Sequence, residues 1–145
     1  MTRQALETYQ VLVYLAAIAM GLILVVTSVS ALHIEHKRLL ALADGAAAAA
    51  ADALDESYFE ARGSDLPLSD ASVMAAVEDH LAVQPPALLE RFDRLTIISP
   101  TGSPDGSSAQ VSLGAVTSPA FLPFGLIPGR EGITLEVTST ARATP

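Results

Sequence analysis

Two histidines, His33 and His36, lie three residues apart, a spacing that places both side chains on one face of a helix. Two imidazoles on one face would supply half of the ligands of a tetrahedral zinc ion. A third ligand, such as His80, would have to come from a distant segment. The adjacent Lys37 and Arg38 instead indicate that the two histidines are simply polar residues at a membrane boundary. The sequence therefore predicts no metal site.

Three carboxylates, Asp52, Asp55 and Glu56, cluster in a segment with strong helix propensity. On an exposed helix such groups are solvated, whereas a glycosidase-type pair needs a cleft. The chain has no cysteine, which removes thiol catalysis, Cys-ligated zinc and disulfides. It contains no phosphate-binding loop, nucleophile elbow or dinucleotide fingerprint. We expect a non-enzymatic protein with no cofactor and no small-molecule substrate.

The charge of the chain is strongly acidic, with 8 Lys and Arg against 16 Asp and Glu, a formal net charge of −8. Beyond Arg38 there are five basic and fourteen acidic residues, a net charge of about −9. A surface of this sign repels the phosphate backbone of nucleic acids. Nucleic acid is therefore excluded as a partner.

The elements that carry these groups begin with an apolar segment. Val11–Leu32 holds 22 residues without a formal charge, which as a helix would span about 33 Å and match the hydrocarbon core of a bilayer. The hydroxyls of Thr27, Ser28 and Ser30 are tolerated there because they can bond to carbonyls one turn back. We predict an N-terminal tail at 1–8 and a single transmembrane helix at 9–32.

A cleaved secretory signal is the alternative interpretation of this segment, since Val29-Ser30-Ala31 resembles a small-residue cleavage site. Its apolar core is longer than that of a usual signal peptide, and Glu7 offsets Arg3 in the leader. These features favour an anchor that stays in place. The flanking Lys and Arg residues alone lean towards a cytoplasmic C-terminal side.

An alanine-rich segment follows at 33–63. It contains no proline, six consecutive alanines at Ala46–Ala51, and a natural helix stop at Gly63. We expect the membrane helix to continue into this segment as one rod. Small residues spaced by four form a shallow face for a partner helix or a second copy, the alternative being packing on the chain's own C-terminal domain. The candidate helix-packing seam consists of Ala41, Gly45, Ala49 and Ala53.

Residues 33–53, with the sequence HIEHKRLLALADGAAAAAADA, follow the apolar segment directly. This arrangement resembles the TadE/TadG-like membrane proteins of bacterial Flp (tight-adherence) pilus assembly, which carry a hydrophobic segment, a basic turn and an Ala-Asp-rich helix. The resemblance covers residues 9–56 best. It implies pilus-assembly or other membrane proteins as partners, self-association among them. It also implies a C-terminal domain outside the cytoplasm, against the local charge count.

The C-terminal domain is predicted at 64–145. Ser69-Asp70 is a good helix start, and a buried stripe of Val73, Val77 and Leu81 follows, ending at Pro85-Pro86. Strands are expected at three places, the middle one half-buried: Leu95–Ser99, around Val111, Leu113 and Ala115, and around Ile133, Leu135 and Val137. The fold class is α+β, with a short helix on a small antiparallel sheet.

A proline-bounded apolar loop separates the last two strands. It either forms an exposed contact patch or caps the open end of the small core. The candidate contact residues are Phe121, Leu122, Phe124, Leu126 and Ile127.

Together these features predict a single-pass component of a Flp/Tad-type pilus assembly or related secretion system, held in the cell membrane and in contact with lipid. It would act by helix packing and protein–protein contact. The alternative is a secreted or membrane-tethered, non-catalytic binding module.

Overall fold

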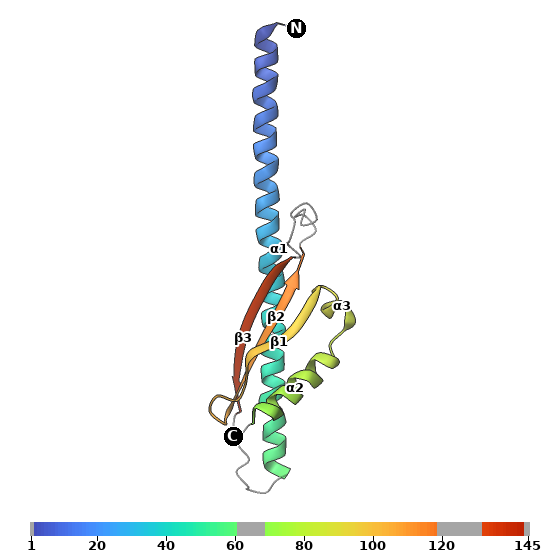
Figure 1. Cartoon of the computed structure of the whole chain (residues 1–145), viewed down its shortest axis with the longest axis vertical. Coiled ribbons are helices and arrows are strands. Elements are labelled where there is room, and N and C mark those ends of the chain that lie inside the picture. Colours follow the sequence, from blue (N-terminus) through green and yellow to red (C-terminus); the bar gives the residue numbers. More distant parts are fainter. Residues whose placement is uncertain (1, 61–68, 119–131, 144–145) are drawn as a thin grey trace.

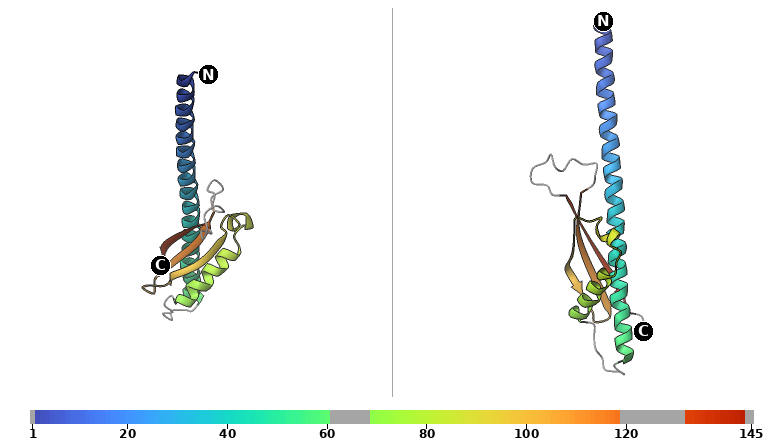
Figure 2. Two further views of the ribbon diagram at one scale, coloured as in Figure 1. Left: turned by 45° about the horizontal axis from the view of Figure 1, so that its top comes forward. Right: turned by 90° about the vertical axis from the view of Figure 1, so that its right-hand side faces the viewer.

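The computed structural model describes residues 2–60, 69–118 and 132–143. One long helix dominates it, and a small sheet with two shorter helices packs against the C-terminal half of that helix (Figure 1). The N-terminal half extends beyond the folded domain (Figures 1 and 2). The α+β fold class is therefore correct: a long apolar N-terminal helix, a short helix and a three-stranded antiparallel sheet.

The long helix α1 runs from Arg3 to Glu60, 58 residues, or about 87 Å at ~1.5 Å per residue. No proline interrupts it. The hydroxyl of Thr27 donates to the carbonyl of Ile23 at 2.7 Å, and Ser28 donates to Leu24 at 2.7 Å. Each hydroxyl is thus satisfied within the helix itself, which lets polar residues lie in an apolar segment.

Helix α2 spans Asp70–Ala82 and begins where the sequence predicts. The Ser69 hydroxyl accepts a hydrogen bond from the backbone N–H of Ser72 at 3.1 Å, and the Ser72 hydroxyl accepts one from the backbone N–H of Ser69 at 3.2 Å. This capping box satisfies amide groups that the first turn of a helix leaves unpaired. Val73 and Val77 are fully buried and Leu81 packs against the core, so the predicted stripe is confirmed.

A four-residue helix, α3 (Pro86–Leu89), follows α2 and was not expected from the sequence. Pro85-Pro86 ends α2, as predicted, but Pro86 also occupies the first turn of α3. Proline fits there because its fixed φ suits a helix and its missing N–H has no helical partner to lose.

The sheet consists of β1 (Arg94–Gly102), β2 (Ser108–Thr117) and β3 (Ile133–Arg142), antiparallel in the order β1-β2-β3. All three predicted strands are present, and each is longer than its apolar pattern alone indicated. Both helices lie on one face of the sheet: α1 packs on β2 and β3, and α2 packs on α1 and β1 (Figure 2). The domain is thus a two-layer sandwich.

The core lies between the helices and the inner face of the sheet. Between Leu39 and Ala51 the buried residues of α1 recur at spacings of three and four, which is the spacing of one helical face. Alanine dominates this face, so the helix axis can approach the sheet closely. The buried side chains of this interface are Leu39, Leu42, Ala43, Ala46, Ala47, Ala50 and Ala51 on α1, Ala109, Val111, Leu113 and Ala115 on β2, and Val137 on β3.

The outer face of β2 differs from the expectation of a half-buried strand, because it is covered as well. Ser112 is 1% exposed, and its hydroxyl donates to the carbonyl of Pro100 at 2.6 Å and lies 2.9 Å from the hydroxyl of Thr138. At Gly114 an added Cβ would lie 3.1 Å from Ile98. Small residues on the outer face of β2 are covered by longer side chains of both neighbouring strands. The alternation of apolar and polar residues along β2 therefore does not predict which of its side chains are exposed.

Candidate membrane anchor and membrane-proximal surface

The N-terminal part of α1 exposes fifteen large apolar side chains between Leu6 and Val29. Within Arg3–Ala53 the helix is long and apolar enough to cross a membrane, and 6% of its most apolar 18-residue stretch is buried. A signal sequence near an N-terminus has the same length and composition, so the geometry alone is compatible with both. Exposed large apolar residues here are Leu6, Tyr9, Val11, Leu12, Val13, Tyr14, Leu15, Ile18, Met20, Leu22, Ile23, Leu24, Val25, Val26 and Val29.

Burial along α1 increases between residues 27 and 39: Thr27, Ala31, Leu32, Glu35 and Arg38 are partly buried, and the buried core face begins at Leu39. Among residues 2–38 only Ser28 is buried, and its hydroxyl is bonded to its own helix. Leu39, by contrast, is fully buried against the domain. Residues 33–38 therefore separate an apolar exposed segment from the segment that carries the core.

The four residues of the helix-packing seam lie at the edge of the buried stripe of α1. Ala41 and Ala53 are exposed, and Gly45 and Ala49 are partly buried. At Gly45 an added Cβ would lie 3.0 Å from Nε2 of His80, so glycine allows α2 to approach α1 closely there. His80 in turn lies 3.0 Å from the amide nitrogen of Gln84. The chain's own α2 thus covers the middle of the seam, while both ends stay open.

A charged cluster marks the boundary segment. Glu35 Oε1 lies 2.6 Å from an Arg38 guanidinium nitrogen and 3.6 Å from one of Arg91. Its other oxygen, Oε2, is buried with no hydrogen-bond partner among the described residues. The Arg91 contact ties the segment between α3 and β1 to α1 three residues beyond Leu32. This pairing is not predictable from local sequence patterns, because 56 residues separate Glu35 from Arg91.

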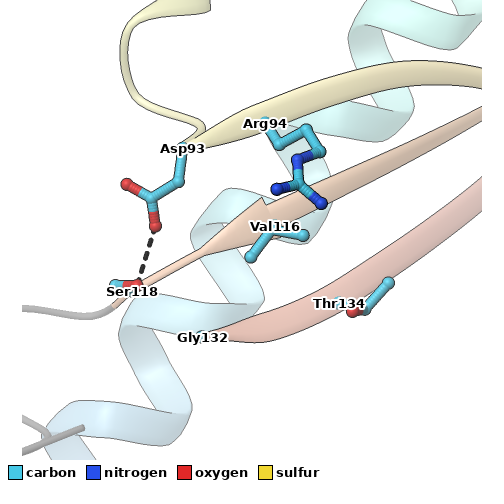
Figure 3. A pocket seen from close by; sticks show the side chains of 6 residues that line it. All are labelled: Asp93, Arg94, Val116, Ser118, Gly132 and Thr134. Atoms are coloured by element: carbon cyan, nitrogen blue, oxygen red, sulfur yellow. Dashed lines mark hydrogen bonds between the residues drawn. The ribbon is translucent and has the colours of Figure 1, made fainter. Parts of the chain in front are cut away.

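A hollow of about 550 Å³ opens at the same end of the sheet, on its outer face (Figure 3). Arg94, Val116 and Thr134 are register partners across the three strands and form its floor. Asp93, Ser118 and Gly132 complete the lining. We call this hollow, defined by these six residues, the Arg94 pocket.

The two charges of the Arg94 pocket do not pair with each other. Asp93 Oδ2 accepts a hydrogen bond from the Ser118 hydroxyl at 2.7 Å, and the backbone N–H of Asp93 donates to the carbonyl of Val116 at 2.9 Å. Figure 3 shows the Asp93 carboxylate turned towards Ser118 and the Arg94 guanidinium extending away from it. Neither charge forms an ion pair within residues 2–60, 69–118 and 132–143. Asp93 thus lies on one side of the hollow and Arg94 on the other.

The histidines considered as metal ligands lie apart from this pocket. His33 and His36 are exposed on α1, and His80 is half-buried on α2. No group of three or more His, Cys, Asp or Glu side chains with metal-binding geometry occurs in the described part of the chain. The five contact-loop candidates, residues 121, 122, 124, 126 and 127, lie outside the described residues.

The opposite end of the sheet carries a polar turn between β1 and β2. Asp105 Oδ1 accepts hydrogen bonds from the backbone N–H groups of Ser107 and Ser108 at 2.9 and 2.7 Å, and Oδ2 accepts one from the Ser108 hydroxyl at 2.9 Å. These donors favour the charged carboxylate and lower the pKa of Asp105 to about 2, the bond from the Ser107 backbone contributing most. The role of Asp105 is therefore to hold the turn.

The two ends of the domain differ in charge. Lys37, Arg38, Arg91 and Arg94 lie at the end nearest the apolar segment, with Glu35, Glu90 and Asp93. Elsewhere in the described part of the domain, the charged residues are mainly acidic. Comparison with protein families, with characterised proteins and with solved structures finds no match to this chain.

Proposed function

We propose that the chain is a single-pass membrane protein that acts by helix packing and protein–protein contact, as a component of a Flp/Tad-type pilus assembly or related secretion system. The observation that supports this most directly is the exposed apolar part of α1, which extends from a folded domain whose core begins at Leu39. In water this surface would be costly at about 25 cal/mol per Å² of apolar area. Lipid or a partner helix removes that cost.

The anchor is the segment 9–32, and the alanine-rich part of α1 connects it to the domain. In this arrangement α1 has two surfaces for partners: the lipid-embedded face, and the open ends of the seam at Ala41 and Ala53. A second membrane helix with small side chains could approach there closely. The domain is placed outside the cytoplasm on the basis of the resemblance.

Membrane insertion is tested by alkaline carbonate extraction of membranes from expressing cells, with mass spectrometry of the mature chain. An anchor predicts an intact chain that stays in the pellet. A chain that is recovered soluble and lacks residues 1–31 would rule out the anchor. Orientation can be tested by cysteine labelling, because the chain has no native cysteine. An engineered Thr140→Cys should react in intact cells with a membrane-impermeant maleimide if the domain lies outside the cytoplasm.

The assembly role is tested separately by photo-crosslinking. Benzoylphenylalanine at Ala41 or Ala53 should capture a specific membrane protein or a second copy of the chain. The same probe at Glu136, exposed on the outer face of the sheet, is the matched control. Equal crosslinking at all three positions would contradict a seam on α1.

A secreted, non-catalytic binding module is the second candidate, and one observation favours it. Cleavage after Ala31 would leave intact every described core residue, since the core begins at Leu39. The mature mass distinguishes the two candidates directly.

A further inference from the structure

We propose that the Arg94 pocket binds the headgroup of a phospholipid that carries a phosphate and a primary ammonium, that is, a phosphoethanolamine headgroup. This inference rests on the proposed membrane anchor and names the lipid chemistry that the domain would recognise beside it. It depends on three features of the pocket: its height along α1, its two separated charges and its hydroxyl groups.

The height of the pocket follows from two contacts. Arg91 lies 3.6 Å from Glu35, which is three residues, or about 4.5 Å along the helix axis, beyond Leu32. The backbone N–H of Asp93 donates to the carbonyl of Val116, which is part of the pocket floor, so Asp93 is fixed to β2 at the same height. With 9–32 in the hydrocarbon, the pocket lies in the headgroup layer, which adds roughly 5–8 Å on each side of the bilayer core. Figure 1 shows this end of the sheet facing the apolar half of α1.

The charges of the pocket match a zwitterion better than an anion. Arg94 offers a planar fork of N–H donors, the geometry that suits phosphate oxygens, and the Thr134 hydroxyl lies across the floor from it. Asp93 accepts from Ser118 through Oδ2, and within the described residues Oδ1 accepts no hydrogen bond, so it can accept one from an ammonium group. A headgroup with phosphate alone would face the Asp93 carboxylate without compensation.

The same reasoning separates ethanolamine from choline. A primary ammonium donates three hydrogen bonds, whereas a trimethylated ammonium donates none and is bulkier. Arg94 would serve both headgroups equally through the phosphate. Asp93 is therefore the residue that should set the preference for ethanolamine over choline, and Arg94 the residue that should set retention of either lipid.

The test is native mass spectrometry of the full chain released from nanodiscs that contain equal amounts of phosphatidylethanolamine, phosphatidylcholine and phosphatidylglycerol with matched acyl chains. The wild type should retain phosphatidylethanolamine preferentially. Arg94→Gln should reduce the retention of phosphatidylethanolamine and phosphatidylcholine alike, by about fivefold. Asp93→Asn should reduce the retention of phosphatidylethanolamine more than that of phosphatidylcholine, so that the ethanolamine-to-choline ratio falls by about threefold. Arg142→Gln, exposed at the far end of β3, is the control and should match the wild type.

Preferential retention of phosphatidylglycerol, or a wild-type profile in both Arg94→Gln and Asp93→Asn, would overturn the pocket assignment while leaving the anchor in place. A chain that does not enter the nanodisc at all would refute the anchor itself. Circular dichroism of each variant should match the wild type, and a Thr134→Val variant provides a second, uncharged test. Like Arg94→Gln, Thr134→Val should reduce the retention of both phosphatidylethanolamine and phosphatidylcholine.

Discussion

The close approach of α1 to the sheet makes one substitution especially informative. Ala47 is fully buried on the face of α1 that carries the core, and its neighbour Ala48 is exposed on the same helix. Ala47→Leu and Ala48→Leu add the same three carbons to adjacent helical residues, with the same small change in helix propensity. The difference between them therefore isolates packing against the sheet.

The magnitude follows from the lack of space. Overpacking of a well-packed core costs about 1–3 kcal/mol. An alanine-lined interface leaves the new side chain no flexible neighbour on α1 to displace, so we expect the upper end of this range. Ala47→Leu should lower the free energy of unfolding by about 3 kcal/mol. Ala48→Leu should change it by less than about 0.5 kcal/mol, as is usual for surface substitutions.

The assay is hydrogen–deuterium exchange of the β2 amides, with the full chain in detergent micelles so that α1 keeps an apolar surrounding. About 3 kcal/mol corresponds to an exchange rate more than a hundredfold faster across β2, since 1.4 kcal/mol is tenfold. Equal protection in both variants would refute the close packing of this face of α1 on β2.

Two further predictions concern the domain. Ser69→Ala removes the N-cap hydroxyl that accepts from Ser72 and should lower the stability of α2 by about 1 kcal/mol, seen as faster exchange of its first-turn amides; unchanged exchange there would contradict the capping box. The pKa of Asp105 in the folded protein is about 2, below its ordinary value of 3.8, so its contribution to stability is complete above pH ~4 and is lost as the pH falls towards 2. The melting temperature of the wild type should therefore exceed that of Asp105→Asn more at pH 5 than at pH 2, and an identical difference at both would show that the charged form is not preferred.

Much of the domain is predictable because its patterns are local. Alternating apolar residues at Val111, Leu113 and Ala115 mark the inner face of β2, and the four-residue spacing of Val73 and Val77 marks the buried face of α2. The helix α3 is not predicted, because Pro85-Pro86 is typical of a helix end. A second proline can also begin the next helix.

In the alanine-rich segment, the local sequence pattern does not predict which face of α1 is buried. When every side chain is equally small, no periodicity distinguishes one face of a helix from another. The buried face of α1 is set instead by Leu39 and Leu42, the two large residues that begin it. The exposed seam residue Ala41 differs from the buried Ala43 only in its angle around the helix, and packing against the sheet decides which of the two is buried.

The Arg94 pocket was beyond sequence reasoning for a different reason. Arg94, Val116 and Thr134 become neighbours only through the register of three strands, which apolar alternation does not fix. A one-residue slip in either strand pair would place Arg94 and Thr134 on opposite faces of the sheet. The charges at Asp93 and Arg94 were visible in the sequence, but what lies across the sheet from them was not.

The absence of proline from α1 has a mechanical consequence. One uninterrupted helix runs from the apolar segment into the core of the domain, without the proline that most often kinks a helix. In the proposed membrane arrangement, it would behave as a rigid lever that pivots at the edge of the bilayer. From Leu32 to Glu60 the arm is about 42 Å, so a 10° tilt of the anchor would swing the far end of the domain by roughly 7 Å. Rotation or tilt of a neighbouring membrane helix would reach the domain as displacement, with little lost to bending on the way.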